Sequence, residues 1–354
     1  MSQEDIRNYF ESNTGNLEYN TDENTDISNM NCHYFTESSF SDIHASINDG
    51  LTFVHLNIRS LCRKFDDFKV LAEAMCSDRT IIGISETWFS SETDLNLFSL
   101  PGYKLIDNHR PDKKGGGVAL YIPDQIDFRV CYDFNVMNEM IETLFVELCI
   151  PGKSGIMLGV VYRPPHGSLN LVMNEMQNIL SNKLFDNKIT FLMGDFNVNL
   201  LNHNENNAIG DFLNMMVSFS FMPLITKPTR VTETSATLID NIFTTLQPFP
   251  DSGIIISDIS DHFPVFAKAD LGRNPPVNNA NDYFRVCTPD NVLKLAEALS
   301  LTDWSEVISD SIVSSSFESF FQKFMVLYNE NIPLCKRKVK NRKKVPLLPW
   351  ITKS

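Results

Sequence analysis

Two polar side chains stand at the end of a strongly apolar segment. The run Phe191–Gly194 leads directly to Asp195 and Asn197, which lie two residues apart. Side chains at positions i and i+2 of a strand share one face, so this carboxylate and this amide are expected to point at one spot. Gly194 beside them lets the backbone turn tightly. The pair therefore predicts a polar site where a buried strand ends.

Other polar residues stand at the ends of apolar segments elsewhere in the chain. Carboxylate and amide oxygens suit a hard divalent cation such as Mg²⁺, and a carboxylate beside a histidine favours the imidazolium that suits an anionic substrate. Such groups together could hydrolyse a phosphodiester. Taken singly, each has a plainer explanation, such as a strand-end cap or a structural histidine. These residues are Asn57, Glu86, Tyr162, Asp240 and the pair Asp261-His262.

The apolar segments predict one α/β domain over residues 51–270. Mostly β structure with interspersed helices and no strict alternation indicates antiparallel or mixed sheets with helices packed outside. The run Gly115–Gly117 precedes a strand and lacks a phosphate-loop pattern, which favours a hairpin turn. We expect strands at 52–57, 80–85, 117–122, 144–148, 156–162, 189–194, 238–243, 254–256 and 263–267, and helices at 65–75, 169–180 and 208–219.

The two ends of the chain differ from this domain in charge. The 354 residues carry a net charge of −14, yet residues 336–344 contain seven Lys and Arg side chains. We expect residues 1–48 to be a disordered acidic leader and residues 271–288 to be a linker. Residues 289–354 would be a helical connector with a basic tail, which is either a solvated linker or a targeting or nucleic-acid patch.

Composition argues against several other classes of protein. A hydrophobic content of 43% is ordinary for a globular domain, and no apolar run is long enough to predict a membrane span. The acidic N-terminus lacks the apolar core of a secretory signal. The seven cysteines show no CxxC spacing, which indicates reduced thiols in an intracellular compartment and no zinc site.

The order and neighbours of these polar residues resemble the exonuclease–endonuclease–phosphatase superfamily over about residues 51–270. The segments Leu56–Leu61, Ser85–Trp88 and Val161–Pro165 are similar to those of endonuclease domains from LINE-type (non-LTR) retrotransposons. The resemblance implies a four-layer sandwich of two mixed β-sheets flanked by helices. The further matching segments are Gly115–Tyr121, Gly194–Asn197, Thr237–Asp240 and Ser260–His262.

The resemblance implies a metal site and two departures from the family pattern. Glu86 would be the main Mg²⁺ ligand, with Asn57 and Asp261 nearby and Mn²⁺ able to substitute. Arg59 stands where many apurinic-site nucleases have a carboxylate, which weakens the expectation of a second metal. Asn241 stands where an aromatic residue is frequent. Neither change removes a core catalytic group.

The resemblance also implies a catalytic group. Asp195 would polarise the attacking water, and Asn197 would hold water or a phosphate oxygen. Tyr162 would donate a hydrogen bond to the scissile phosphate. His262 would contact the same phosphate, oriented by Asp240.

The implied function is Mg²⁺-dependent endonucleolytic nicking of double-stranded DNA in the nucleus, leaving a 3′-hydroxyl for target-primed reverse transcription. Element RNA and a reverse transcriptase domain would be further partners, although the chain contains no Tyr-x-Asp-Asp-type pair. Two alternatives stay open. One is a superfamily phosphatase or phosphodiesterase acting on phospholipid or inositol phosphate. The other is a degenerate DNA-binding remnant without catalysis.

Overall fold

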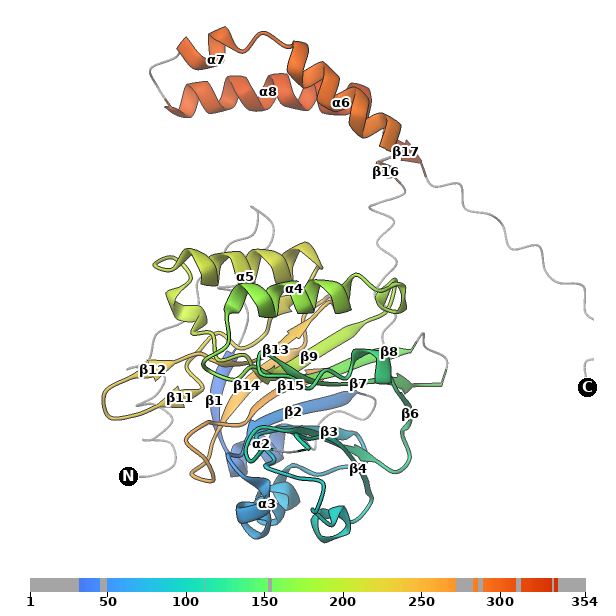
Figure 1. Ribbon diagram of the computed structural model, residues 1–354, viewed down its shortest axis with the longest axis vertical. Helices are drawn as coiled ribbons and strands as arrows, with labels where there is room; N and C mark the ends of the chain where they lie inside the picture. The colour runs from blue at the N-terminus through green and yellow to red at the C-terminus, as the bar shows by residue number, and fades with distance from the viewer. Residues whose placement is uncertain are drawn as a thin grey trace, which may run out of the picture. The chain divides into compact units, whose positions relative to one another are not determined.

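The computed structural model divides the chain into two units, Met1–Asn274 and Pro275–Ser354. Figure 1 shows the helices and strands of each unit along the chain. Each unit is described by itself below. The residues that the structure describes are 32–44, 50–111, 113–151, 155–271, 283–285, 289–309, 313–332 and 334–336.

The first sheet of the first unit contains seven described strands in the order β1-β14-β15-β2-β3-β5-β4. The pairs β1/β14 and β2/β3 are parallel, and the other neighbours are antiparallel. The strands are β1 (Cys32–Thr36), β2 (Leu51–Asn57), β3 (Thr80–Ser85), β4 (Tyr103–Asn108), β5 (Val118–Pro123), β14 (Asp251–Ile256) and β15 (Val265–Ala269).

The second sheet contains six described strands in the order β10-β13-β9-β8-β7-β6. Only β8 and β9 are parallel among the described pairs of this sheet. The strands β11 (Arg230–Val231) and β12 (Ala236–Thr237) form a separate ribbon. The sheet strands are β6 (Asp127–Val130), β7 (Glu142–Cys149), β8 (Ile156–Tyr162), β9 (Thr190–Asp195), β10 (Met222–Pro223) and β13 (Asp240–Thr244).

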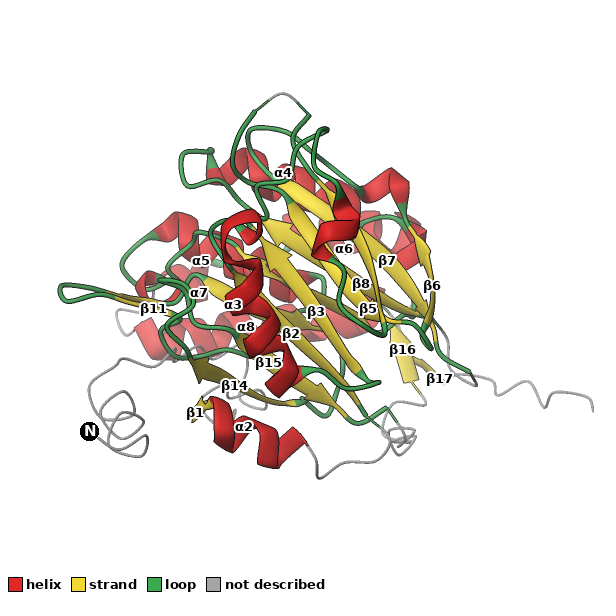
Figure 2. Ribbon diagram, turned by 90° about the horizontal axis from the view of Figure 1, so that it is seen from below, coloured by secondary structure: helices red, strands yellow, loops and turns green. Residues whose placement is uncertain are grey.

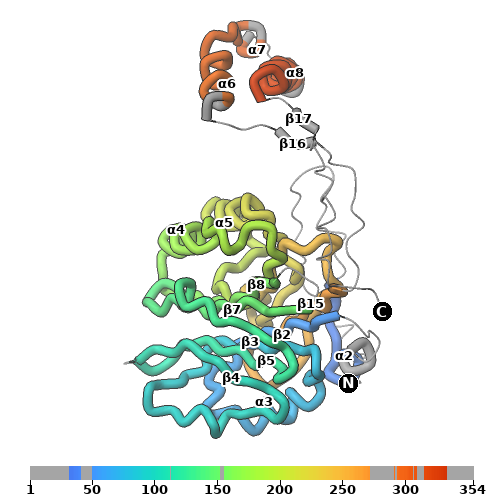
Figure 3. Tube along the Cα trace, turned by 90° about the vertical axis from the view of Figure 1, so that its right-hand side faces the viewer, coloured from blue at the N-terminus to red at the C-terminus, as the bar shows by residue number. Residues whose placement is uncertain are grey.

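Helices cover the outer faces of the two sheets, which gives the predicted four-layer sandwich (Figure 3). Helix α3 (Leu61–Met75) packs on the first sheet, and α4 (Leu169–Leu180) and α5 (Asn207–Ser218) pack on the second. Between the sheets, Phe53 of β2 stacks on Phe191 of β9 with ring centroids 4.2 Å apart. Because both faces of each central strand are covered, these strands are buried along their length and largely apolar.

The predicted hairpin at the glycine run is confirmed. Strands β4 and β5 pair antiparallel with Asn108 opposite Val118, and Gly115–Gly117 lie in the connection between them. Figure 2 shows the strands of the first sheet behind α3.

The predicted disordered leader is wrong for residues 32–44. Cys32–Thr36 forms the edge strand β1, and Glu37–His44 forms helix α2. The Tyr34 side chain is fully buried, and its hydroxyl donates a hydrogen bond to the Pro228 carbonyl at 2.9 Å. The leader is acidic overall, which favoured disorder in the prediction, but it contains a short strand that forms one edge of the sheet. Residues 1–31 and 45–49 lie outside the described residues.

The second unit contains three described helices and a pair of short strands. The helices agree with the predicted helical connector, whereas the strand pair was not expected. The basic tail from residue 337 lies outside the described residues. None of the helices among the described residues is long and apolar enough to cross a bilayer. The elements are β16 (Tyr283–Arg285), α6 (Pro289–Leu301), α7 (Ser305–Ser309), α8 (Val313–Asn331) and β17 (Leu334–Lys336).

Candidate active site

The sheet topology brings the predicted site residues to one end of the sandwich. Parallel neighbours end at the same edge, so Asn57 at the end of β2 lies beside the residues that follow β3. In the same way, Tyr162 at the end of β8 is in register with Asp195 at the end of β9. Strand β13 runs antiparallel to β9, so its first residue, Asp240, pairs with Asp195.

One amide joins two carboxylates at the centre of this site. The Asn57 Nδ2 donates to Glu86 Oε1 at 3.0 Å and to Asp195 Oδ2 at 2.8 Å. The Tyr162 hydroxyl donates to the same Glu86 oxygen at 3.3 Å, and Trp88 Nε1 donates to Glu86 Oε2 at 3.1 Å. Residues on or just after four strands therefore meet at one pair of carboxylates.

The predicted pair of Asp195 and Asn197 is held rigidly. The Asn197 backbone N–H donates to Asp195 Oδ1 at 2.9 Å, and its side-chain amide donates to Asp195 Oδ2 at 3.1 Å. The same amide donates to the Arg163 carbonyl at 2.7 Å, and the Arg163 guanidinium returns a bond to the Asn197 carbonyl at 2.8 Å. The pair thus caps the strand and also fixes the Asp195 carboxylate.

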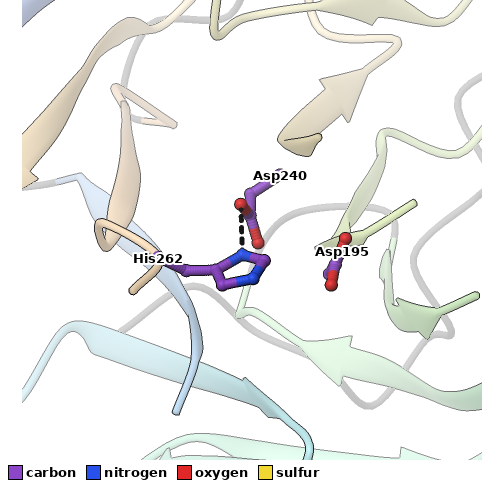
Figure 4. Close-up of side chains that lie close together, drawn as sticks. All are labelled: Asp195, Asp240 and His262. Atoms are coloured by element: carbon purple, nitrogen blue, oxygen red, sulfur yellow. Dashed lines mark hydrogen bonds and ion pairs between the residues drawn. The ribbon is translucent and has the colours of Figure 1, made fainter. Parts of the chain in front are cut away.

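Asp240 and His262 form the second predicted pair. The His262 Nδ1 lies 2.8 Å from Asp240 Oδ2, and the Thr229 hydroxyl donates to the same oxygen at 2.7 Å. Figure 4 shows the imidazole bonded to Asp240, with Asp195 lying next to the pair. One potential ligand atom from each of these three residues lies within 4.8 Å of the others.

Burial and charge set the protonation states of this cluster. Burial, followed by the charge of Asp240, raises the pKa of Asp195 to about 7. Burial alone would lower the pKa of His262, but the charge and hydrogen bond of Asp240 raise it to about 9. Burial alone would raise the pKa of Asp240, but His262 holds it below its usual range. The pair is therefore an imidazolium and a carboxylate near neutral pH.

The glycine run positions the loop that carries Glu86. The Thr87 N–H donates to the Gly117 carbonyl at 3.2 Å, and the Trp88 N–H donates to the Gly116 carbonyl at 2.9 Å. Gly117 has φ +87°, and a Cβ there would collide with the Thr87 hydroxyl. Its N–H donates to buried Glu142 Oε2 at 2.5 Å. The hairpin therefore positions the loop that carries Glu86 through its own backbone groups.

The donor chemistry fits a hard divalent cation at Glu86. Two carboxylates, Glu86 and Asp195, converge on one amide, and carboxylate oxygens are the ligands such ions take. Asn57 presents its nitrogen to both carboxylates, while its Oδ1 accepts from the Arg59 N–H at 3.1 Å. The cluster at His262 fits a cation less well, because a protonated imidazole has no free lone pair to bind one.

Asp261 is placed differently from the other predicted metal ligands. Its Oδ2 accepts from Arg59 Nη1 at 2.9 Å, and from Arg230 Nε and Nη2 at 3.0 and 2.7 Å. The described contacts join it to these two arginines and not to Glu86. Asn241, the other departure noted in the sequence, bonds the backbone of Ile225 through its side chain.

A buried histidine that was not predicted from the sequence lies behind the Asp240–His262 pair. His55 is fully buried on β2, and its Nδ1 lies 4.0 Å from Asp240 Oδ1. Neither of these two atoms has a hydrogen-bond partner in the structure, whereas His55 Nε2 lies 3.2 Å from the Ser85 hydroxyl. The sequence contains an indication of this residue, because His55 interrupts an apolar strand two residues before Asn57 and on the same face of that strand.

Comparisons with known proteins agree with this architecture. A search of curated proteins found no match. The endonuclease domain of TRAS1, a telomere-specific non-LTR retrotransposon, aligns with a TM-score of 0.51 and 14% identity, over 63% of this chain and 100% of that one. The AP endonuclease LMAP from Leishmania major aligns with a TM-score of 0.53 and 16% identity, over 72% of this chain and 96% of that one.

These structural similarities establish the fold alone, because the identities are low. The family model is more direct, since it matches the sequence over residues 31–262, which includes β1 and every predicted site residue. The chain therefore belongs to the endonuclease/exonuclease/phosphatase family.

Proposed function

We propose that the chain is a metal-dependent endonuclease that nicks double-stranded DNA and leaves a 3′-hydroxyl. The observation that carries this proposal is the buried Asp195 carboxylate. It is bonded by Asn57 on one side and lies next to the Asp240–His262 pair on the other. A proton acceptor, an imidazolium and an oxygen-donor site therefore meet within one small region.

Asp195 is suited to accept a proton from the attacking water. Its pKa of about 7 lies near the working pH, where a general base is most effective. Asn57 and Asn197 bond its Oδ2 and hold the carboxylate in one orientation. Fixed orientation matters because a misplaced base loses much of its rate advantage.

Two groups are suited to hold the phosphate. His262 carries a positive charge near neutral pH, and Asp240 fixes its ring through Nδ1. Burial raises the pKa of the Tyr162 phenol well above its usual range, so this group remains a hydrogen-bond donor. Preorganised donors and charges of this kind stabilise negative charge that develops on phosphate oxygens.

Glu86 would hold the divalent cation, which would supply Lewis-acid neutralisation of the phosphate and the leaving oxygen when bound. A 3′-hydroxyl at a nick could prime synthesis by a reverse transcriptase. We propose this role because of the retrotransposon-like segments in the sequence, and because the TRAS1 endonuclease domain shares the fold. Nuclear location and element RNA as a partner belong to the same proposal.

A plasmid-nicking assay tests the proposal. The purified chain should convert supercoiled DNA to the nicked form with Mg²⁺ and stop when EDTA is added. Polymerase should extend the nicks without prior phosphatase treatment, because the product end is a 3′-hydroxyl. Glu86→Gln, which keeps the shape but removes the charge, should lower nicking by ~10²-fold or more with an unchanged circular dichroism spectrum.

The same preparation distinguishes the rival functions. Phosphate release from phosphoinositides, with no nicking, would favour a phosphatase and contradict the proposal. DNA binding without nicking at any Mg²⁺ or Mn²⁺ concentration would indicate a binding remnant.

A further inference from the structure

Asp261 holds two arginines from separate parts of the chain. Arg59 lies just after β2, and Arg230 lies on β11. Both guanidinium groups donate to one oxygen, Asp261 Oδ2, at distances between 2.7 and 3.0 Å. Sharing one acceptor fixes the two cations side by side, whereas two isolated surface arginines would repel each other.

This arginine pair remains open to solvent. The side chains of Arg59 and Arg230 are 56% and 39% exposed, compared with 28% for Asp261. The described contacts use one nitrogen of Arg59 and two of Arg230, so N–H donors of both remain available. The three charges sum to +1, in a chain whose net charge is −14.

The pair is tied to the candidate active site by three short connections. The Arg59 N–H donates to Asn57 Oδ1 at 3.1 Å. Arg230 follows Thr229, whose hydroxyl bonds Asp240. Asp261 directly precedes His262 in the sequence. Any anion bound by these arginines would therefore lie close to the reacting phosphate.

The geometry favours a phosphate ligand over a metal ion at this position. Arginine presents planar N–H donors that suit phosphate oxygens, and a second cation would meet two guanidinium charges. We propose that Arg59 and Arg230, held by Asp261, bind a backbone phosphate of the DNA strand beside the scissile one. The proposal rests on the DNA substrate proposed above and names a specific contact with it.

Salt-dependent binding by the full-length chain tests this site. A fluorescent DNA duplex is titrated in EDTA, so that no cleavage occurs, at salt concentrations from 50 to 200 mM. Removing an arginine that binds a phosphate should make the negative slope of log affinity against log salt shallower by ~0.9. Arg59→Gln and Arg230→Gln should each show this change, and each should weaken binding by a factor about threefold larger at 50 mM than at 200 mM.

Arg129→Gln is the matched control. Arg129 is also an exposed arginine, 65% accessible and paired with Glu147, but it lies on the edge strand β6. Its slope should equal that of the wild type. If all three variants keep the wild-type slope, the proposal is overturned, because Arg59 and Arg230 would then form only an ordinary surface ion pair with Asp261.

Two further outcomes separate this proposal from its rivals. If Asp261 instead holds a metal, Asp261→Asn should raise the Mg²⁺ concentration needed for nicking while the arginine variants keep the wild-type slope, which would overturn the phosphate site. If the arginine variants have a reduced slope but the wild type never nicks, the phosphate site is supported and the proposed nuclease function fails.

Discussion

Strained residues concentrate around the candidate active site. Among the described residues, seven other than glycine have positive φ, and five of them lie in loops that carry the site. Left-handed backbone costs about 1–3 kcal/mol per residue unless the surroundings enforce it. Here hydrogen bonds to the loop backbone help to enforce this conformation. The Gly116 and Gly117 carbonyls accept from the N–H groups of Trp88 and Thr87, and the Asp195 carboxylate accepts from the Asn197 N–H. The five residues are Arg59, Ser60, Glu86, Trp88 and Asn197.

The charge of His262 should depend on Asp240. In the wild type, His262 stays protonated up to about pH 9, because the carboxylate raises its pKa. Asp240→Asn removes that charge, and burial then lowers the pKa, so the imidazolium is lost at a lower pH. We expect nicking by Asp240→Asn to be ~10²–10⁴-fold slower than nicking by the wild type near pH 8, and we expect this deficit relative to the wild type to shrink toward pH 6. Rates measured from pH 6 to 9 check this, and parallel profiles for both proteins would contradict it.

His55 should make the fold sensitive to acid. Burial lowers its pKa from 6.5 to about 4, so the unfolded chain binds more protons between these values. The stability from neutral His55 is complete above pH 6.5 and is lost as the pH falls toward 4. When the pH falls from 7.5 to 5, the free energy of unfolding of the wild type should fall by about 2 kcal/mol more than that of His55→Gln, whose side chain at this position does not titrate.

Urea unfolding at the two pH values measures this difference. His166→Gln serves as the control, because this histidine is exposed in the loop after β8. This control should lose as much free energy of unfolding between the two pH values as the wild type does. Equal losses for the wild type and His55→Gln would show that His55 does not remain neutral in the folded chain.

At the scale of elements, two parallel strand pairs explain why the site forms. Strands β2 and β3 end together, as do β8 and β9, and the two sheets face each other through the Phe53–Phe191 stack. Four strand ends therefore converge from two layers. The antiparallel strands β13 and β15 add Asp240 and His262, because they begin where their neighbours end.

The edge strand β1 and helix α2 should be necessary for stability. Phe40 on α2 is 1% exposed and packs edge-to-face on Phe266, with ring centroids 4.8 Å apart. Phe40→Ala should lower the free energy of unfolding by about 3–5 kcal/mol. Val70→Ala on α3, whose side chain is 70% exposed, should change it by less than about 0.5 kcal/mol. Denaturant titration compares them, and a small effect at Phe40 would mean that this segment adds nothing to the core.

At the scale of the whole molecule, the predicted site residues and the basic tail lie in different parts of the sequence. All predicted site residues precede position 270, whereas seven basic residues fall in 336–344. We expect a chain that ends at residue 335 to nick the same positions. The negative slope of its log DNA affinity against log salt concentration should become shallower by ~0.9 for each phosphate contact that the tail makes. Nick maps of both chains check this, and altered positions or an inactive short chain would show that the tail belongs to the active enzyme.

Much of the fold could be predicted from periodicity. The helix predicted at 169–180 has the same bounds in the structure, and the one predicted at 208–219 differs by one residue at each end. Strand β1 was missed because its five residues lie in an acidic, Asn-rich segment without sustained periodicity. An edge strand is stabilised by its pairing with β14, which no local pattern reveals.

The sequence by itself determined which side chains stand at strand ends, because an apolar run followed by a polar residue is a local pattern. It also determined the family, because the segments occur in order along the chain. Only the tertiary structure decided which of these residues meet. It joined Asn57 to Asp195 across 138 positions and placed Asp261 between Arg59 and Arg230. Such contacts depend on strand order and on the packing of the two sheets, and neither is encoded within any single segment.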